Sequence, residues 1–406
     1  MAKAKATIGI DIGTYSIKIL GINKDTKEAL FLEVKDSYGV QKGRIKEPVE
    51  TAKIINEMLE NIERKYSSPI ENIFVNINGS KLELIPSSAS ISVGRADQKV
   101  SEEDIVRVKE EVKMINLQSN NKKILDIFTK EWTLDNEKES RDPLGMQGFK
   151  LKLDAMLLSA FNSDIEAVIE ALDDNDISEE NIVPGPVADV NAILTPSQKE
   201  LGVALINIGA GTSSITIYED GKILNMAVFP IGSMNITNDI AIGFKTEIEI
   251  AEEIKKKHGS CFKKNGQSKK INFPIGNDDE EDEKKKKEYL SFSEKELIKI
   301  IEARVCEIFE LAQGEIKKVS KQGMLPAGII ITGGGSNLSG IVELAKKEFK
   351  LPAKIGYCKE IKGIEKDPTL STVCGVLLSR NERDISFAPE NKFLKKIKKI
   401  FSNFTP

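Results

Sequence analysis

Two segments of this sequence share one pattern, and their similarity limits the possible folds more than anything else in the chain. Residues 8–19 (IGIDIGTYSIKI) and 204–217 (ALINIGAGTSSITI) each contain two runs of alternating apolar residues around a glycine turn. This pattern predicts a β-hairpin. The segments match once Ala210 and Gly211 are allowed as extra turn residues. They lie about half the chain apart, which predicts two related lobes rather than a solenoid. Two unrelated hairpins are the plainer alternative.

A third glycine-rich turn occurs in residues 328–337, with the sequence GIIITGGGSN. An apolar strand leads into Gly333, Gly334 and Gly335, so we expect a helix to follow with Ser336 or Asn337 as its N-cap. Elsewhere the apolar periodicity predicts helices over residues 48–65, 163–173, 246–257 and 293–319, and a capping box at 101–104 predicts another to about residue 115.

The composition excludes several classes of function. The 59 Lys and Arg nearly balance the 63 Asp and Glu, whereas a nucleic-acid-binding protein normally has a basic excess. A single histidine rules out a site with two imidazoles. The four cysteines form no C-x-x-C pair, which argues against a zinc ribbon or a disulfide framework. We expect a cytosolic chain with neither a signal peptide nor a membrane-spanning helix, because no apolar run approaches about 18 residues.

Residues 263–288 carry blocks of opposite charge, DDEEDE at 278–283 and four lysines directly after it. A stretch with so little apolar content cannot bury a core. We therefore expect a disordered surface loop here.

Glycine turns suit a polyphosphate because they let backbone N–H groups approach it closely. Asp11 ends the first strand and could hold Mg²⁺ through water, since this ion dehydrates reluctantly. Lys18, in the next strand, can reach a phosphate as a point charge. Taken singly, Asp11 reads equally well as a turn former and Lys18 as a solvated strand residue. Three such turns in duplicated lobes together predict a nucleotide site.

These motifs resemble those of the actin, heat-shock chaperone and sugar kinase superfamily. Residues 11–18 match its first phosphate loop, 207–214 its second, and 333–336 its adenosine motif. Within the superfamily the chain resembles the FtsA family of bacterial cell-division actin homologues. That resemblance rests on PIGSMNITNDIAIG at 230–243, RDPLGMQG at 141–148 and DPTLSTVCG at 367–375.

The resemblance implies an α/β, two-lobed actin-like ATPase fold with duplicated ribonuclease-H-like lobes and an inserted subdomain. The expected parts are a first lobe (1–83 and 163–200), the insert (84–162), a second lobe (201–243 and 320–383), a partner-binding subdomain (244–319), a linker (384–391) and a terminal helix (392–404).

The resemblance also implies a set of binding residues. ATP with Mg²⁺ would be held by Asp11 (to the metal through water), Gly13, Thr14, Tyr15, Lys18, Asn207, Gly209, Ala210, Gly211, Thr212, Gly232, Lys255, Gly333, Gly334, Gly335 and Ser336. Lys255 would lie against the adenine; its alternative is a solvated charge run. Arg304 and Glu307 would bind the C-terminal peptide of FtsZ, the tubulin-like division protein, or would form only an intrahelical ion pair.

Some residues depart from the family pattern. Asn207 stands where the family usually has Asp, Ala210 where a third glycine is frequent, and Ser213 and Ser214 replace a frequent Thr-Asp pair. Near residues 184–187, where actin orients the attacking water, we find no Gln, Glu or His. Phosphoryl transfer depends on that positioning. We therefore expect ATP binding with weak ATPase activity at most, and assign no catalytic residue.

The tail places five apolar residues on one helical stripe and a sixth, Leu394, at its edge, with five lysines on and beside the opposite face. The apolar residues are Phe393, Leu394, Ile397, Ile400, Phe401 and Phe404. This pattern favours an in-plane anchor on an anionic membrane surface over a helix docked on the core.

The expected function is a filament-forming division protein on the cytoplasmic face of the cell membrane at the septum, which tethers FtsZ and helps to assemble the other divisome proteins. A pilus assembly scaffold like PilM, or a small-molecule kinase of the same superfamily, is the alternative.

Overall fold

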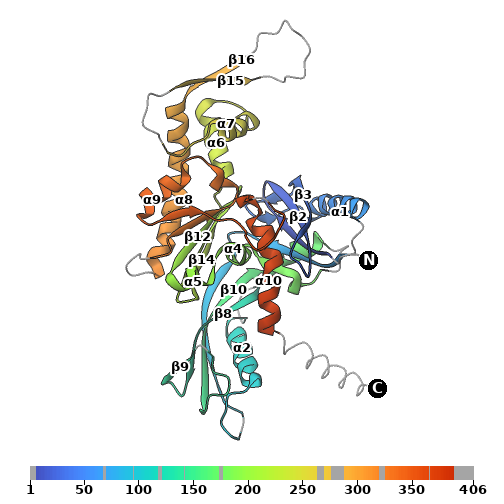
Figure 1. The fold of residues 1–406 in the computed structure, drawn as a ribbon, viewed down its shortest axis with the longest axis vertical. Helices are drawn as coiled ribbons and strands as arrows, with labels where there is room; N and C mark the ends of the chain where they lie inside the picture. The colour runs from blue at the N-terminus through green and yellow to red at the C-terminus, as the bar shows by residue number, and fades with distance from the viewer. Residues whose placement is uncertain are drawn as a thin grey trace.

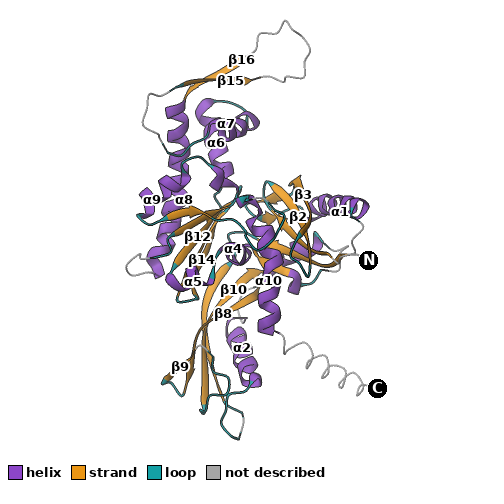
Figure 2. Ribbon diagram, viewed as in Figure 1, coloured by secondary structure: helices purple, strands orange, loops and turns teal. Residues whose placement is uncertain are grey.

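The computed structural model describes residues 6–66, 70–94, 96–117, 121–140, 142–172, 177–262, 269–275, 288–319, 325–364 and 366–387. Two five-stranded sheets lie side by side at its centre, with helices packed on them (Figures 1 and 2). A third sheet extends from one end and a two-stranded ribbon from the other. The fold is therefore two-lobed, with an appendage at each end.

The two central sheets have the same topology. The first has the order β11-β6-β1-β2-β3 and the second β14-β13-β12-β17-β18. In the first sheet β1, β2 and β3 are antiparallel neighbours, and β6 and β11 run parallel to β1. In the second sheet β12, β13 and β14 are antiparallel neighbours, and β17 and β18 run parallel to β12. This equivalence confirms the duplicated lobes. The strands are β1 (Ala6–Ile12), β2 (Ser16–Asn23), β3 (Ala29–Asp36), β6 (Ile70–Ile77), β11 (Ile182–Pro184), β12 (Val203–Ile208), β13 (Ser213–Glu219), β14 (Lys222–Phe229), β17 (Ile329–Thr332) and β18 (Ala353–Ile355).

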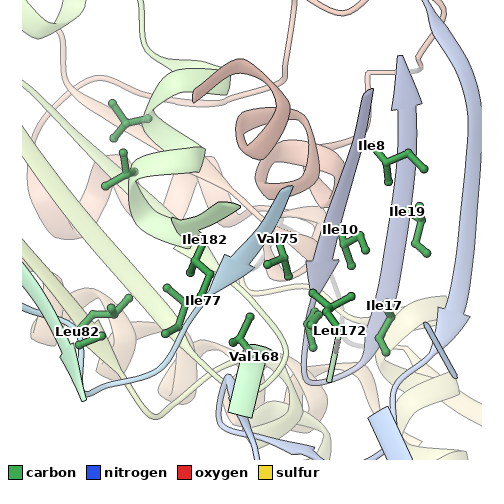
Figure 3. Close-up of a cluster of buried hydrophobic side chains, with 14 of the residues drawn as sticks. Ile8, Ile10, Ile17, Ile19, Val75, Ile77, Leu82, Val168, Leu172 and Ile182 are labelled. Atoms are coloured by element: carbon green, nitrogen blue, oxygen red, sulfur yellow. The ribbon is translucent and has the colours of Figure 1, made fainter. Parts of the chain in front are cut away.

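The alternating isoleucines of the first hairpin fill the core of the first lobe. Ile8 and Ile10 of β1 lie beside Ile17 and Ile19 of β2, and all four are fully buried (Figure 3). Successive side chains of a strand point to opposite faces, so the period of two places these residues on one face. The isoleucines whose alternation predicted the hairpin therefore form the buried face of its two strands.

Helices pack against the two sheets and against one another. They are α1 (Pro48–Lys65), α3 (Asn162–Glu170), α4 (Gly185–Ile193), α5 (Pro196–Leu201), α6 (Ser233–Phe244), α7 (Ile248–His258), α8 (Glu294–Val319), α9 (Ile341–Phe349) and α10 (Ser371–Phe387). The helices expected at 48–65, 163–173, 246–257 and 293–319 are present with ends shifted by at most three residues. The expected N-cap of α9 is wrong. A 3₁₀ turn, Gly334–Asn337, begins within the glycines and separates them from the helix, which Gly340 caps.

The last helix, α10, packs on the first lobe. Its Val373, Cys374 and Leu377 share a buried cluster with Leu20 and Ile22 of β2. We expected residues up to 383 to belong to the second lobe, and for this helix that division is wrong. After β18 the chain therefore returns to the first lobe, where the apolar face of α10 covers the first sheet. The helix also continues to Phe387, so the first four residues of the expected linker 384–391 are helical.

The inserted subdomain is a four-stranded sheet covered by one helix. Its order is β7-β10-β8-β9, and the helix opens with the predicted capping box, in which Ser101 and Asp104 hydrogen bond to each other. It projects from the first lobe at the bottom of Figure 1. Its elements are β7 (Glu83–Ser92), α2 (Glu102–Leu117), β8 (Lys122–Leu134), β9 (Lys138–Ser140) and β10 (Lys150–Phe161).

The disordered loop expected over 263–288 is wrong in part. β15 (Lys270–Ile275) pairs with β16 (Glu288–Ser293) in an antiparallel ribbon that extends beyond α6 and α7 (Figure 1). Phe292 stacks on Phe244 of α6 with 4.6 Å between ring centroids, and Phe273 meets the edge of His258. The sequence KINFPI supplies the buried Phe273, which the neighbouring charge blocks obscured. Those blocks, at 278–287, lie outside the described residues.

Two further observations concern the membrane. No helix in the described part of the chain combines the length and the apolar character that a bilayer crossing requires. The terminal helix expected at 392–404 lies outside the described residues.

Candidate functional site: a cleft between the lobes

A cleft of about 740 Å³ opens between the two sheets, a size in the range of small-molecule sites. All residues predicted to bind the nucleotide line it except Gly232 and Ser336. Ser336 is buried and donates to the carbonyl of Gly333 at 2.7 Å. Gly232 lies behind the second turn, at the start of α6. These two residues therefore shape the turns and do not face the cleft.

The two hairpin turns are closed in the same way and face each other. The N–H of Gly13 donates to the carbonyl of Ser16 at 3.1 Å, and that of Gly209 to the carbonyl of Thr212 at 2.8 Å. The turns almost touch, since a Cβ on Gly211 would lie only 2.7 Å from Oγ1 of Thr14. A side chain at 211 would therefore separate the turns, so glycine is required there.

Asp11 lies at the base of the first turn with both carboxylate oxygens engaged. Asn76 donates its side-chain amide to Oδ1 at 2.6 Å, and Nζ of Lys18 lies 3.3 Å from Oδ2. Asn76 in turn accepts from the N–H of Ile12 at 2.7 Å. The carboxylate is fixed and 6% exposed at the edge of the cleft. This arrangement suits a Mg²⁺ held through water, and Lys18 adds positive charge beside it.

Asp189, which the sequence motifs did not predict as a site residue, also lines the cleft. It lies on α4, and its carboxylate accepts from the amide of Asn207 at 2.6 Å and the hydroxyl of Thr372 at 2.7 Å. Burial raises the pKa of Asp189 to about 7 against these hydrogen bonds, and the negative charge of Asp11 adds to the rise. The available signal was an aspartate within the largely apolar run GPVADVNAI.

No group of three Asp, Glu, His or Cys side chains in the described part of the chain forms a metal cage. A Mg²⁺ that keeps most of its water and binds phosphate oxygens needs only one or two carboxylates. Asp11 and Asp189 are the acidic residues at the base of the two facing turns. The donor set therefore fits a hydrated magnesium ion bound with a nucleotide.

Lys255 is buried, so its interpretation as part of a solvated charge run is wrong. Its ammonium donates to the hydroxyl of Thr237 at 2.7 Å and lies 2.6 Å from the carboxylate of Glu252. Burial lowers the pKa of Lys255, although the Glu252 carboxylate opposes this. The next residue, Lys256, donates to the hydroxyl of Tyr15 at 3.1 Å and so crosses the cleft from α7 to the first turn.

The glycine turn after β17 forms the third wall of the cleft. Gly333 has a φ of +82°, and a Cβ there would lie 2.1 Å from Oδ1 of Asn207. This position therefore requires glycine for both conformation and space. Gly334, Gly335 and Asn337 line the cleft beside it. A flat ring can approach the backbone here.

The predicted partner-binding residues lie on α8, away from the cleft. Arg304 donates from Nε and Nη2 to the carboxylate of Asp239 on α6, at 2.6 and 2.8 Å, and also pairs with Glu307. The intrahelical pair is thus present, together with an unpredicted ion pair between Arg304 and Asp239 that forms a brace between the two helices. Ile242, three residues after Asp239, is 76% exposed on the same face of α6.

Comparisons with known proteins identify the family. Residues 204–375 match the family model "Cell division protein FtsA", and residues 79–159 match "SHS2 domain inserted in FTSA". The cell division protein FtsA of Neisseria meningitidis serogroup B is 30% identical over 377 residues, which cover 91% of this chain and 88% of that protein. The chain belongs to the FtsA family of cell division proteins. The SHS2 match overlaps the expected insert at 84–162.

Solved structures share the fold at lower sequence identity. The PilM–PilN type IV pilus biogenesis complex aligns with a TM-score of 0.61 and 16% identity, over 92% of this chain and 98% of that one. MreB5 of Spiroplasma citri bound to ADP aligns with a TM-score of 0.56 and 13% identity, over 95% and 99%. These likenesses confirm the actin-like fold, whereas the family matches distinguish FtsA from a PilM-like scaffold.

Proposed function

We propose that this FtsA-family protein binds ATP between its lobes and assembles into actin-like filaments on the inner face of the cytoplasmic membrane. There, at the division septum, it tethers FtsZ and recruits other divisome proteins. The observation that carries the proposal is the pair of equivalent turns facing each other across a cleft of about 740 Å³.

The turns after β1 and β12 hold the phosphates of ATP, and the turn after β17 holds the adenosine. Lys255 lies on the wall contributed by α7. When Mg²⁺ is bound, it neutralises charge on the phosphates, and Asp11 holds its hydration shell. The solved MreB5 with ADP supports this assignment, because it shares the fold.

Hydrolysis is weak in this proposal. Phosphoryl transfer to water needs a side chain free to orient the nucleophile. Asp189 is the acidic residue on α4, and hydrogen bonds from Asn207 and Thr372 engage both of its oxygens. The protein therefore acts as a nucleotide-dependent scaffold with slow turnover at most.

Calorimetry with ATP and Mg²⁺ tests the nucleotide site. Gly211→Val should abolish saturable binding, because its side chain would push Thr14 away and part the turns. Gly314→Ala is the matched control, since a Cβ at this glycine of α8 meets nothing within 4 Å. Wild-type protein that shows no saturable ATP binding would refute the assignment.

The surface of α6 and α8 is the proposed docking site for the C-terminal peptide of FtsZ. Arg304 and Glu307 supply charge, and Ile242 supplies an exposed apolar contact beside them. Since Asp239 already holds the guanidinium, Arg304 contributes less free positive charge than the sequence suggested. The apolar contact therefore carries more of the affinity than the ion pair.

The membrane tether is proposed from the sequence of the tail alone. The six apolar residues of 392–404 enter the acyl boundary, and the neighbouring lysines meet anionic headgroups, each contributing about 1 kcal/mol near the surface.

The alternative function, a pilus assembly scaffold like PilM, is matched by the fold but not by the family. A fluorescent fusion distinguishes the two functions in cells. A ring at midcell supports the division scaffold, and its absence from dividing cells supports the alternative.

A further inference from the structure

Asp189 joins three elements at the floor of the cleft. It belongs to α4, while Asn207 is the penultimate residue of β12 and Thr372 is the second residue of α10. Both donors reach its carboxylate, at 2.6 and 2.7 Å, and the side chain is almost fully buried with 3% of its surface exposed. A buried carboxylate is retained only where hydrogen bonds or a positive charge compensate for its lost hydration.

Asn207 and Asp11 hold equivalent positions in the two lobes. Asp11 pairs in register with Lys18 across the first hairpin, and Asn207 pairs with Ser214 across the second. The first lobe thus presents a carboxylate at this position and the second lobe an amide. The amide of Asn207 points at Asp189, so the negative charge on the second side of the cleft belongs to Asp189.

The chemistry of the pair requires one amide and one carboxylate. An amide N–H₂ can donate to a carboxylate, whereas two carboxylates about 2.6 Å apart cannot both be ionised. In the Asn207–Asp189 pair the negative charge therefore lies on Asp189. Asp11 lines the same cleft and lies close enough for its charge to act on Asp189.

We propose that Asp189 is the second acidic residue of the Mg²⁺ site, facing Asp11 across the phosphate turns, and that Asn207 is the donor that orients it. The inference rests on the proposed binding of ATP. The equivalence of the two lobes would place the metal-facing charge at residue 207, whereas this inference places it at Asp189 on α4.

Three variants test the pair: Asp189→Asn, Asn207→Asp and the exchange of the two residues. The readouts are the affinity for ATP with Mg²⁺ and with EDTA, and the melting temperature without nucleotide. Asp189→Asn should lower the gain in affinity that Mg²⁺ gives by about tenfold. Its melting temperature should change little, because the amide oxygen of the asparagine can accept from Asn207 while its N–H₂ donates to the hydroxyl of Thr372.

The other two variants distinguish a charge pair from a structural contact. Asn207→Asp should melt at a lower temperature, because it places two carboxylates together. The exchanged variant should recover both the melting temperature and the increase in ATP affinity that Mg²⁺ gives, because it retains one amide and one carboxylate. A Mg²⁺ gain in Asp189→Asn equal to that of the wild type would overturn the inference. Failure of the proposed function looks different, since the wild type itself would then bind no ATP in either condition.

Discussion

Individual buried carboxylates order the loops around them in this protein. Asp104 of the insert accepts from the N–H and the hydroxyl of Ser101 and from the N–H of Gly94, and it pairs with Arg107. Burial alone would raise the pKa of Asp104, but these hydrogen bonds and the charge of Arg107 outweigh it, so the pKa lies below its ordinary value. The ionised form therefore stabilises the folded insert.

Asp104→Asn should lower the free energy of unfolding by about 2 kcal/mol near pH 7. A carboxyl whose pKa is lower in the folded state stabilises above its unfolded value, here 3.8, and loses that contribution as the pH falls through the folded value. Urea unfolding at pH 7 and pH 3 should show the difference between variant and wild type shrinking in acid. Glu103→Gln, on the exposed side of α2, is the control and should change stability by less than about 0.5 kcal/mol. A difference that is the same at both pH values would contradict this account.

At this scale the sequence predicted residues whose role is set by local geometry. Gly13, Gly209 and Gly333 could be assigned to turns because the strands on either side of them are visible in the pattern. Asp189 could not, because its donors lie 18 and 183 residues away in the sequence. The role of a single buried aspartate can be inferred only when the tertiary fold shows its hydrogen-bond partners.

Among the elements, the β15–β16 ribbon depends on two aromatic contacts with the helices beneath it. Phe292 is 4% exposed and stacks on Phe244, while Tyr289 on the same strand is 54% exposed. Periodicity predicted the long helices to within a few residues, because each has an apolar face of its own. The ribbon was missed because its strands are short and flank a charged stretch.

Phe292→Ala should lower the free energy of unfolding by about 3–5 kcal/mol, through lost burial and the cavity left behind. Tyr289→Ala, the matched control, should change it by less than about 0.5 kcal/mol. Urea titration followed by circular dichroism measures both. Equal effects of the two substitutions would mean that the ribbon does not pack on α6.

The brace between α6 and α8 makes a test of the docking surface possible. Arg304→Glu should weaken binding of the FtsZ C-terminal peptide by more than tenfold, as should Ile242→Glu, with ATP binding unchanged. Because Arg304→Glu also breaks the pair with Asp239, its stability should fall. Exchanging the two residues (Asp239→Arg with Arg304→Asp) should restore the melting temperature but not the peptide affinity. If both recover, Arg304 is a brace and not a docking residue.

The whole molecule places its appendages at opposite ends of the cleft-containing body (Figure 1). A head-to-tail contact between unlike surfaces does not close on itself and produces a filament. The inserted subdomain at one end is the proposed contact with the next subunit. Electron microscopy on a lipid monolayer with ATP tests this, and a field of dispersed monomers would contradict it.

Membrane attachment is the property of the whole chain that the tail should control. Deletion of residues 392–406, or Phe401→Glu, should release the protein from anionic liposomes in a flotation assay. Raised salt should weaken wild-type binding, because the lysines act through charge. Lys399→Arg keeps the charge and should float like the wild type. Full retention of the deletion variant would locate the anchor elsewhere in the chain.

The contact of Lys256 with Tyr15 has a consequence for how quickly a nucleotide can enter and leave. It bridges the rim of the cleft from α7 to the first turn, and its ammonium also lies 5.1 Å above the tyrosine ring. Both side chains are about half exposed, 57% for Lys256 and 48% for Tyr15. A contact between such groups is worth no more than about 1 kcal/mol. Opening the rim is therefore a fast side-chain event, and in the proposed nucleotide complex the residence time should depend on the contacts of the two turns rather than on this rim contact.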